Sequence, residues 1–354
     1  MNLKRDLQAV QHYAVESLRR AAGPSSSGRR SLMRSGLLAA CALAATAAYV
    51  AYRARQAERE HPPTGRFIEV EGVKLHYLER GDGPPVVLLH GNGATATDFE
   101  GSGVIDRLAA RYRVIAFDRP GFGYSERPRK RIWTPHAQAA LLVRALAQLD
   151  VRQPVVVGHS WGALVALQLA VDFPQCTRGL VLVSGYYFPT WRADVFLLSP
   201  PAIPVLGDLM RYTISPLISR LLARPMMRKM FAPRSISPRF ESAVPLPLML
   251  RPSQLRAAAE ESGLMSWAAA ALKGSYRNVT VPVTIIAGVG DRVVDLRRQA
   301  LRLHREIPHS HLRTQAGAGH MLHYVAPHIV VQAVGDVVSA TARPESPLVG
   351  MPLV

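Results

Sequence analysis

The chain has 354 residues, of which 48% are hydrophobic, and this is enough for one large core with appendages but not for several independent domains. It carries 43 Lys and Arg against 25 Asp and Glu, a formal net charge of +18. The basic residues are scattered as isolated arginines, without the clustered stripe or interleaved aromatics of nucleic-acid binding sites, so no nucleic-acid partner is expected. A solvated surface and a face near anionic lipid are the two interpretations of this charge. The two cysteines, Cys41 and Cys176, are too few for a disulfide framework and lack metal-site spacing.

The N-terminal segment, residues 1–30, combines an amphipathic pattern with a stretch that breaks helices. Apolar residues recur at helical spacing from Leu3 to Leu18, among basic side chains, and this predicts a short basic amphipathic helix. Such a helix can lie on a membrane surface or form a partly frayed extension, and the pattern leaves both open. The sequence from Gly23 to Gly28 (GPSSSG) predicts a flexible linker.

An uncharged stretch of 18 residues runs from Ser35 to Tyr52. A helix of this length extends about 27 Å at about 1.5 Å per residue, which is close to the thickness of a bilayer core. We therefore expect a single-pass transmembrane helix over residues 31–55, with a cleaved signal peptide as the alternative. Arginines flank both ends, so the sequence predicts membrane attachment but leaves the side of the catalytic portion open.

Short apolar runs alternate with helical patterns in the rest of the chain. Side chains alternate in the pattern of a β-strand on both sides of a Glu71-Gly72 turn, and this predicts a β-hairpin from Phe67 to Leu78. Further strands are predicted at 85–89, 112–117, 154–157, 179–183, 281–287 and 311–314. Helices are predicted at 134–149, 162–172 and 296–306, and after Pro327. This alternation indicates an α/β fold with a mostly parallel central sheet flanked by helices.

The alternation stops between Ser184 and Asn278, where Pro, Leu, Met and Arg predominate. We interpret this stretch as an inserted helical cap that divides the core into two parts. The expected organisation is an N-terminal segment and linker at 1–30, the transmembrane helix at 31–55, core parts at 62–183 and 279–342, the cap at 184–278, and a disordered tail at 343–354.

The pentapeptide Gly158-His159-Ser160-Trp161-Gly162 lies between a predicted strand and a predicted helix. A serine on so tight a turn has its Oγ exposed, and glycines two positions to either side let the strand and the helix pass without collision. GxSxG alone is a weak signal because it arises by chance in many loops. Its place between a strand and a helix makes Ser160 the candidate nucleophile.

A serine hydroxyl needs a histidine to take its proton and usually a carboxylate to orient that histidine. Asp291 follows the strand at 281–287, and His320 follows the last strand in a loop lined by glycines. Both therefore lie at the carboxyl ends of strands, where open α/β sheets bind ligands. Asp291 could instead be a turn carboxylate, and Asp295 is its competitor, but we favour Asp291. No comparable loop surrounds His304, His309, His311, His323 or His328.

An oxyanion site is expected in the sequence His90-Gly91-Asn92-Gly93, directly after the strand at 85–89. An acyl-transfer enzyme stabilises the oxyanion with backbone N–H groups, and those of Asn92 and Trp161 are the expected donors. The alternative is an ordinary glycine turn. We expect His90 to order this loop rather than to transfer a proton.

Taken together with Asp118–Ser125 (DRPGFGYS), these motifs resemble the α/β-hydrolase fold family, in particular its serine hydrolases of the esterase and lipase type. The resemblance covers roughly Phe67 to Val338. It implies that Ser160 is the nucleophile, His320 the base and Asp291 the acid, with Asn92 and Trp161 as oxyanion donors and Asp118–Ser125 as a structural loop. Related epoxide hydrolases and haloalkane dehalogenases carry aspartate where Ser160 stands, so neither chemistry is expected.

The expected function is a membrane-anchored serine hydrolase that cleaves carboxylic esters through an acyl-enzyme. No metal or organic cofactor is required for this mechanism. The Leu- and Met-rich cap would line an apolar pocket for a small-molecule or lipid ester, or it would merely pack onto the core. Carbon–carbon bond hydrolysis and a haloperoxidase-like activity use the same triad, and a non-catalytic binding module is the alternative of another class. The natural substrate and the oligomeric state are left open.

Overall fold

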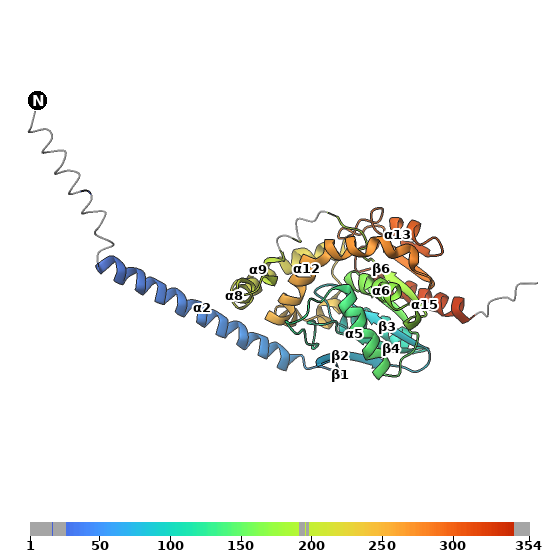
Figure 1. Ribbon diagram of the computed structural model, residues 1–354, viewed down its shortest axis with the longest axis horizontal. Coiled ribbons are helices and arrows are strands. Elements are labelled where there is room, and N and C mark those ends of the chain that lie inside the picture. The colour runs from blue at the N-terminus through green and yellow to red at the C-terminus, as the bar shows by residue number, and fades with distance from the viewer. Residues whose placement is uncertain (1–15, 17–25, 191–194, 196–197, 343–354) are drawn as a thin grey trace, which may run out of the picture. The chain divides into compact units, whose positions relative to one another are not determined.

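The computed structural model describes Glu16 and residues 26–190, 195 and 198–342 (Figure 1). The chain divides into two compact units, Met1–Tyr49 and Val50–Val354. The amphipathic helix predicted from Leu3 to Leu18 lies outside the described residues, Glu16 apart, and so does the predicted disordered tail at 343–354.

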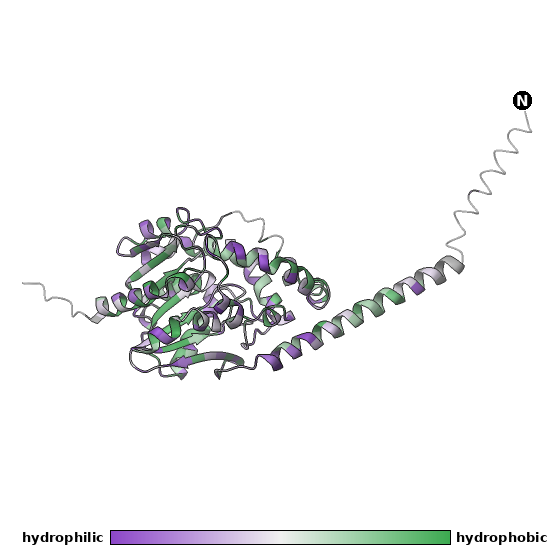
Figure 2. Cartoon of the chain, turned by 180° about the vertical axis from the view of Figure 1, so that it is seen from behind, coloured by the Kyte–Doolittle hydropathy of each residue, from purple (hydrophilic) through white to green (hydrophobic). Residues whose placement is uncertain are grey.

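Helix α2, Ser26–Glu60, contains the stretch predicted to cross a membrane. Its segment Met33–Glu60 is long and apolar enough to do so, a property that signal sequences near an N-terminus share. Most side chains of the first part of the helix are exposed, and its apolar residues stand out in Figure 2. The helix is longer than predicted and begins at Ser26, so the second half of the Gly23–Gly28 segment is helical rather than a linker.

Eight strands form one sheet in the order β1-β2-β4-β3-β5-β6-β7-β8. They are β1 Arg66–Val70, β2 Val73–Arg80, β3 Pro85–Leu89, β4 Arg113–Phe117, β5 Val155–His159, β6 Gly179–Val183, β7 Val283–Gly288 and β8 His311–Gln315. The β1–β2 hairpin is antiparallel and β2 runs antiparallel to β4, whereas the remaining neighbours are parallel. The predicted α/β class with a mostly parallel sheet is confirmed.

Helices cover both faces of this sheet because alternate strand residues point to opposite sides. One apolar cluster joins Val87 and Leu89 to the helices of one face, and a second joins Val86 and Leu88 to the helices of the other face. On the first face lie α5 Pro135–Gln148, α6 Trp161–Asp172 and α13 Ala300–Glu306. On the second lie α3 Thr97–Gly101, α4 Val104–Ala109, α14 Leu322–Val325 and α15 Pro327–Ala342. The short turn η1, Pro174–Cys176, follows α6.

One helix prediction is wrong at its start. The apolar spacing predicted a helix over 296–306, but α13 begins at Ala300. Asp295 accepts a hydrogen bond from the backbone N–H of Arg298 at 2.7 Å and thereby closes a turn before the helix. Short aspartate side chains compete with helical hydrogen bonding in this way.

The segment between β6 and β7 contains several helices joined by irregular loops, and residues 184–190 and 232–237 are not helical. Its elements are η2 Pro200–Ala202, α8 Leu206–Tyr212, α9 Ser215–Phe231, α10 Pro238–Ala243, α11 Leu246–Met249, α12 Pro252–Leu272 and η3 Lys273–Asn278. A separate apolar cluster, which includes Met227, Phe231 and Phe240, packs against Met321 of the core. Because Met321 follows His320, this packing couples the cap to the loop that carries the histidine.

A fully buried ion pair also ties the cap to the core. Arg119, in the loop after β4, lies 2.5 Å and 3.0 Å from the two carboxylate oxygens of Glu261 on α12, and both side chains are shielded from solvent. The Nε–H of Arg119 donates to the carbonyl of His90 at 2.7 Å. The guanidinium therefore joins a cap helix to the loop after β3.

Glu261→Gln should lower the free energy of unfolding by about 3–5 kcal/mol, because it leaves the buried Arg119 charge without a counter-charge. Chemical denaturation of the full-length protein in detergent measures this loss. The matched control is Glu100→Gln, which removes the exposed partner of Arg80 and should cost about 0–1 kcal/mol. Equal losses in the two variants would contradict the structural role assigned to the buried pair.

Candidate active site

Ser160 lies on the turn between β5 and α6, as predicted. Its backbone has φ 53° and ψ −115°, a conformation that is rare and strained for a residue with a side chain. The backbone N–H of Ser160 donates to the carbonyl of Val183 at 2.9 Å and holds the turn against β6. Such a turn presents the serine Oγ at the end of the sheet.

Close packing around this turn explains the two glycines of the motif. A Cβ on Gly158 would lie 2.5 Å from the Cα of Ala163, and one on Gly162 would lie 2.7 Å from the carbonyl oxygen of His90. Real Cβ atoms do not approach so closely, so a side chain at either position would push the helix away from β5 or from the loop after β3.

The structure brings the three predicted triad residues into one hydrogen-bonded series. His320 Nε2 lies 3.1 Å from Ser160 Oγ, and His320 Nδ1 lies 2.9 Å from Asp291 Oδ2. Asp291 Oδ1 accepts the backbone N–H groups of Val293 and Val294 at 2.7 and 2.9 Å. Because the carboxylate accepts the Nδ1 proton, Nε2 presents its lone pair to the Ser160 hydroxyl. This is the arrangement that general-base activation of a serine needs.

The competing candidates are engaged elsewhere. Asp295 closes the turn before α13, and His304 hydrogen-bonds to Ser310 at 2.8 Å. His309 donates to the carbonyl of Val281 at 3.0 Å. The structure therefore favours Asp291 over Asp295 as the partner of the histidine.

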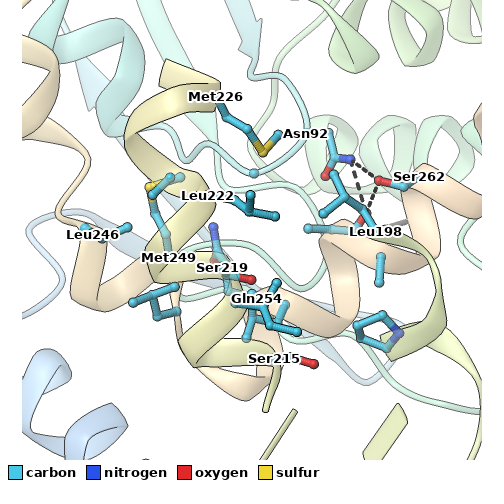
Figure 3. Close-up of a pocket in the computed structure, with 18 of the residues that line it drawn as sticks. Asn92, Leu198, Ser215, Ser219, Leu222, Met226, Leu246, Met249, Gln254 and Ser262 are labelled. Atoms are coloured by element: carbon cyan, nitrogen blue, oxygen red, sulfur yellow. Dashed lines mark hydrogen bonds between the residues drawn. The ribbon is translucent and has the colours of Figure 1, made fainter. Parts of the chain in front are cut away.

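The loop after β3 approaches both the serine and the cap. Asn92 Nδ2 donates to the carbonyl of Ala258 and to Ser262 Oγ, each at 3.1 Å, so α12 holds this loop in place (Figure 3). Trp161 is the first residue of α6, and its side chain is buried. Within the described chain, neither the backbone N–H of Asn92 nor that of Trp161 donates to a protein acceptor. Both remain available to an oxyanion.

His90 orders this loop in its neutral form. Its Nδ1–H donates to the carbonyl of Gly91 at 2.8 Å, and its Nε2 accepts the backbone N–H of Arg119 at 2.9 Å. Burial, together with the positive charge of Arg119, lowers the pKa of His90 to about 3. Protonation would break the bond from the Arg119 backbone, which agrees with the ordering role expected from the sequence.

Three buried residues behind the triad were not singled out from the sequence. His159 Nε2–H donates to the backbone carbonyl of His320 at 3.1 Å, and His323 Nε2–H donates to Asp98 Oδ2 at 3.0 Å. The rings of His159 and His323 lie 4.5 Å apart. Burial and the neighbouring histidines hold the pKa of His159 well below its usual value, so its ring is neutral. For His159 the position next to Ser160 was the available signal, and for His323 the position three residues after His320; Asp98 had no comparable signal.

The same three residues, Asp98, His159 and His323, are the group spaced for a metal ion in the part of the chain that the structure describes. Their ligand atoms lie within 4.8 Å of one another. However, His323 already hydrogen-bonds to Asp98, and His159 to the carbonyl of His320. Because His159 contacts the backbone of His320 and His323 lies three residues further on, we interpret the cluster as a support for the His320 loop.

An apolar cavity opens beside the loop after β3 (Figure 3). Its empty volume, including its open mouth, is about 1220 Å³. Leu222, Met226 and Met249 line it together with other apolar side chains of the cap, and Asn92 and Gly93 line it on the core side. The cavity thus reaches the loop expected to hold the oxyanion.

Comparison with known proteins identifies the family. A family model described as the alpha/beta hydrolase fold matches residues 84–327, and an uncharacterized protein of Mycobacterium bovis is 32% identical over 73% of this chain and 76% of its own length. The chain belongs to the α/β-hydrolase fold family. The 2-hydroxy-6-oxo-2,4-heptadienoate hydrolase of Pseudomonas putida is 28% identical to this hydrolase over 78% of the chain and 96% of that enzyme. The structure of a thermophilic esterase from Thermogutta terrifontis matches with a TM-score of 0.66 and 21% identity, over 78% of this chain and 100% of that one.

The buried, neutral His90 predicts a loss of stability in acid. The unfolded histidine titrates near 6.5, and burial lowers the pKa to about 3 in the folded protein, so the unfolded state binds more protons between these values. The stabilising contribution is complete above pH 6.5 and is lost as the pH falls toward 3, by about 1.4 kcal/mol per pH unit. In His90→Gln, denaturation between pH 6 and pH 4 should show a shallower fall of the unfolding free energy. Equal slopes in wild type and variant would contradict this.

Gly91→Ala should slow hydrolysis without unfolding the protein. The new Cβ would lie 3.0 Å from Ser160 Cβ and 3.1 Å from His159 Nδ1, so the loop must shift away from the serine by a few tenths of an ångström. A displacement of about 1 Å can cost about a hundredfold in rate, so a shift of a few tenths of an ångström should lower kcat by roughly threefold to tenfold. The control is Gly274→Ala, where nothing lies within 4 Å of the new Cβ. Hydrolysis of a chromogenic substrate by the two variants at matched stability measures the effect, and equal rates would count against it.

Proposed function

We propose that this α/β hydrolase is a serine hydrolase that cleaves carboxylic esters while α2 anchors it in a membrane. The observation that carries the proposal is the continuous hydrogen-bonded series from Asp291 through His320 to Ser160. Burial of the Asp291 and His320 side chains, each about 4% exposed, protects that series from competing water.

The proposed reaction has two steps. Ser160 Oγ attacks the ester carbonyl while His320 Nε2 takes its proton, and the N–H groups of Asn92 and Trp161 stabilise the oxyanion. His320 then gives the proton to the departing alcohol, which leaves an acyl-enzyme on Ser160. A water molecule, deprotonated by His320, then attacks the acyl carbon. The bond from this carbon to Ser160 Oγ breaks, His320 returns the proton to Oγ, and the carboxylic acid leaves. Asp291 orients His320 and stabilises its charged form in both steps.

The cavity beside Asn92 supports an ester with a medium or long acyl chain, such as a lipid or acyl-glycerol ester. Leucine and methionine side chains of the cap dominate its wall, and methionine adapts its shape to flexible chains. Its polar groups are few, among them Gln254 and Ser219. An acyl chain placed here would leave its carbonyl near the loop after β3.

Helix α2 supports attachment to a membrane. Its exposed side chains between Met33 and Tyr49 include large apolar groups such as Leu37 and Leu38, whose transfer from water into lipid is favourable. The length and composition of the helix suffice for one pass. Cleavage as a signal sequence is the alternative, and the size of the protein purified from membranes distinguishes the two.

Carbon–carbon bond hydrolysis is the second candidate because the Pseudomonas putida relative is named for a dienoate substrate. Such a substrate carries a carboxylate, which a basic side chain would normally recognise. No Arg, Lys or His is among the described residues that line the cavity. The uncharged wall therefore favours a neutral ester over a dienoate.

Labelling by a fluorophosphonate probe tests the nucleophile. Wild type should be labelled, and Ser160→Ala should neither be labelled nor hydrolyse p-nitrophenyl esters at more than roughly 10⁻⁴ of the wild-type rate. Ser242→Ala, which removes an exposed hydroxyl on α10, should behave as wild type. The wild-type rate should rise from acetyl to medium and long acyl chains. Equal labelling of wild type and Ser160→Ala would end the proposal.

A further inference from the structure

The outer surface of α8 and α9 exposes an unusual number of large apolar side chains. Val205 is 81% exposed and Leu221 is 70% exposed. The face, which we call the α8–α9 face, comprises Ile203, Val205, Leu206, Leu209, Tyr212, Ile214, Leu217, Ile218, Leu221 and Met226. The two helices lie outside α12, on the side away from the sheet (Figure 1). Soluble proteins rarely leave so large an apolar patch in water without a partner.

Basic side chains accompany the apolar ones. Arg220, Arg224, Arg228 and Lys229 on α9 are all exposed. Arg224 lies 3.7 Å from Glu241 of α10, which leaves an excess of positive charge on Arg220, Arg228 and Lys229. The one acidic residue of α8 and α9, Asp208, is already paired with Arg129 and Arg211. The face is therefore positively charged as well as apolar, and an anionic lipid surface complements both properties.

The α8–α9 face is continuous with the apolar cavity. Helix α9 lines the cavity with Leu222, Ala223 and Met227, while Ile218 and Met226 are exposed and also line it. An acyl chain could pass from the outer face to the cavity along apolar side chains. A water-soluble substrate would not need such a route.

We propose that the α8–α9 face inserts into the interface of an anionic membrane and passes lipid esters from the bilayer into the cavity. Only the delivery step rests on the ester hydrolase function proposed above. A second copy of the chain suits this face less well, because two such surfaces would bring their arginines together. A lipid surface buries the leucines and neutralises the basic side chains at once.

Insertion can be measured with the full-length protein in vesicles. A bimane probe would be attached at Leu221→Cys in a Cys41→Ser, Cys176→Ser background, and quenching by spin-labelled lipids recorded. The control is Arg152→Cys, at a side chain that is 90% exposed in the loop before β5. Quenching at residue 221 should exceed that at residue 152 and increase when phosphatidylglycerol is added to phosphatidylcholine. Equal quenching at both positions, or cross-linking between copies through residue 221, would overturn the proposal.

The delivery step needs a separate variant. Leu217→Glu with Leu221→Glu changes two exposed positions, so folding should be retained. Hydrolysis of a long-chain ester embedded in vesicles should fall roughly tenfold or more, because charged glutamates disfavour insertion. Fluorophosphonate labelling and hydrolysis of a short soluble ester should stay at the wild-type level. The matched control is Ile132→Glu with Trp267→Glu, two exposed apolar positions outside this face.

The outcomes separate the two proposals. If the wild type is not labelled by the fluorophosphonate probe, the ester hydrolase function fails while the quenching data still decide membrane insertion. If labelling and soluble activity persist but both double variants hydrolyse embedded ester equally, the delivery step is wrong. Unequal losses, with the larger loss in Leu217→Glu with Leu221→Glu, support it.

Discussion

Ser160 sits on a backbone turn with a positive φ, and the elements around it are packed too closely to admit side chains at the flanking glycines. This close approach brings the loop after β3 against the N-terminus of α6. The N-terminus of α6, which carries a partial positive charge, therefore lies beside this loop. The position of the loop after β3 and the turn that presents the serine thus both depend on the absence of two Cβ atoms.

The histidine that faces the serine is held from several directions. Asp291 binds one ring nitrogen, His159 donates to its backbone carbonyl, and Met321 beside it packs against the cap. The pair formed by Arg119 and Glu261 fixes the loop after β3 to α12. Because several independent contacts hold the histidine and the loop after β3, these groups need little rearrangement when charge develops on the reacting atoms. The cap is therefore part of the support of the site as well as its cover.

The cap has two apolar surfaces with different partners. Its inner surface lines the cavity beside Asn92, and the α8–α9 face points outward. A helix that is apolar on both sides must find a second apolar environment. In the function proposed above, α2 anchors the protein in the bilayer, the α8–α9 face inserts into its interface, and the inner surface of the cap receives the ester.

Much of the fold and the main site residues could be predicted from local patterns. Buried strands appear as short apolar runs, and the glycines around Ser160 and before His320 mark tight turns at strand ends, so the order of the triad followed from the chain alone. The start of α13 was missed because Asp295 closes a local turn that apolar spacing does not reveal. The start of α2 at Ser26 was missed because the glycines and serines between Gly23 and Gly28 are typical of a flexible linker.

Sequence by itself determined the fold class and the apolar stretch that can span a membrane, and it predicted the residues of the triad, because each signal lies within one short segment of the chain. Only the tertiary structure decided that His159 supports His320, that Asn92 is held by Ser262, and that α9 lines a cavity on one side and faces outward on the other. These contacts join residues far apart in the chain. No periodicity encodes them, because they depend on how the elements pack.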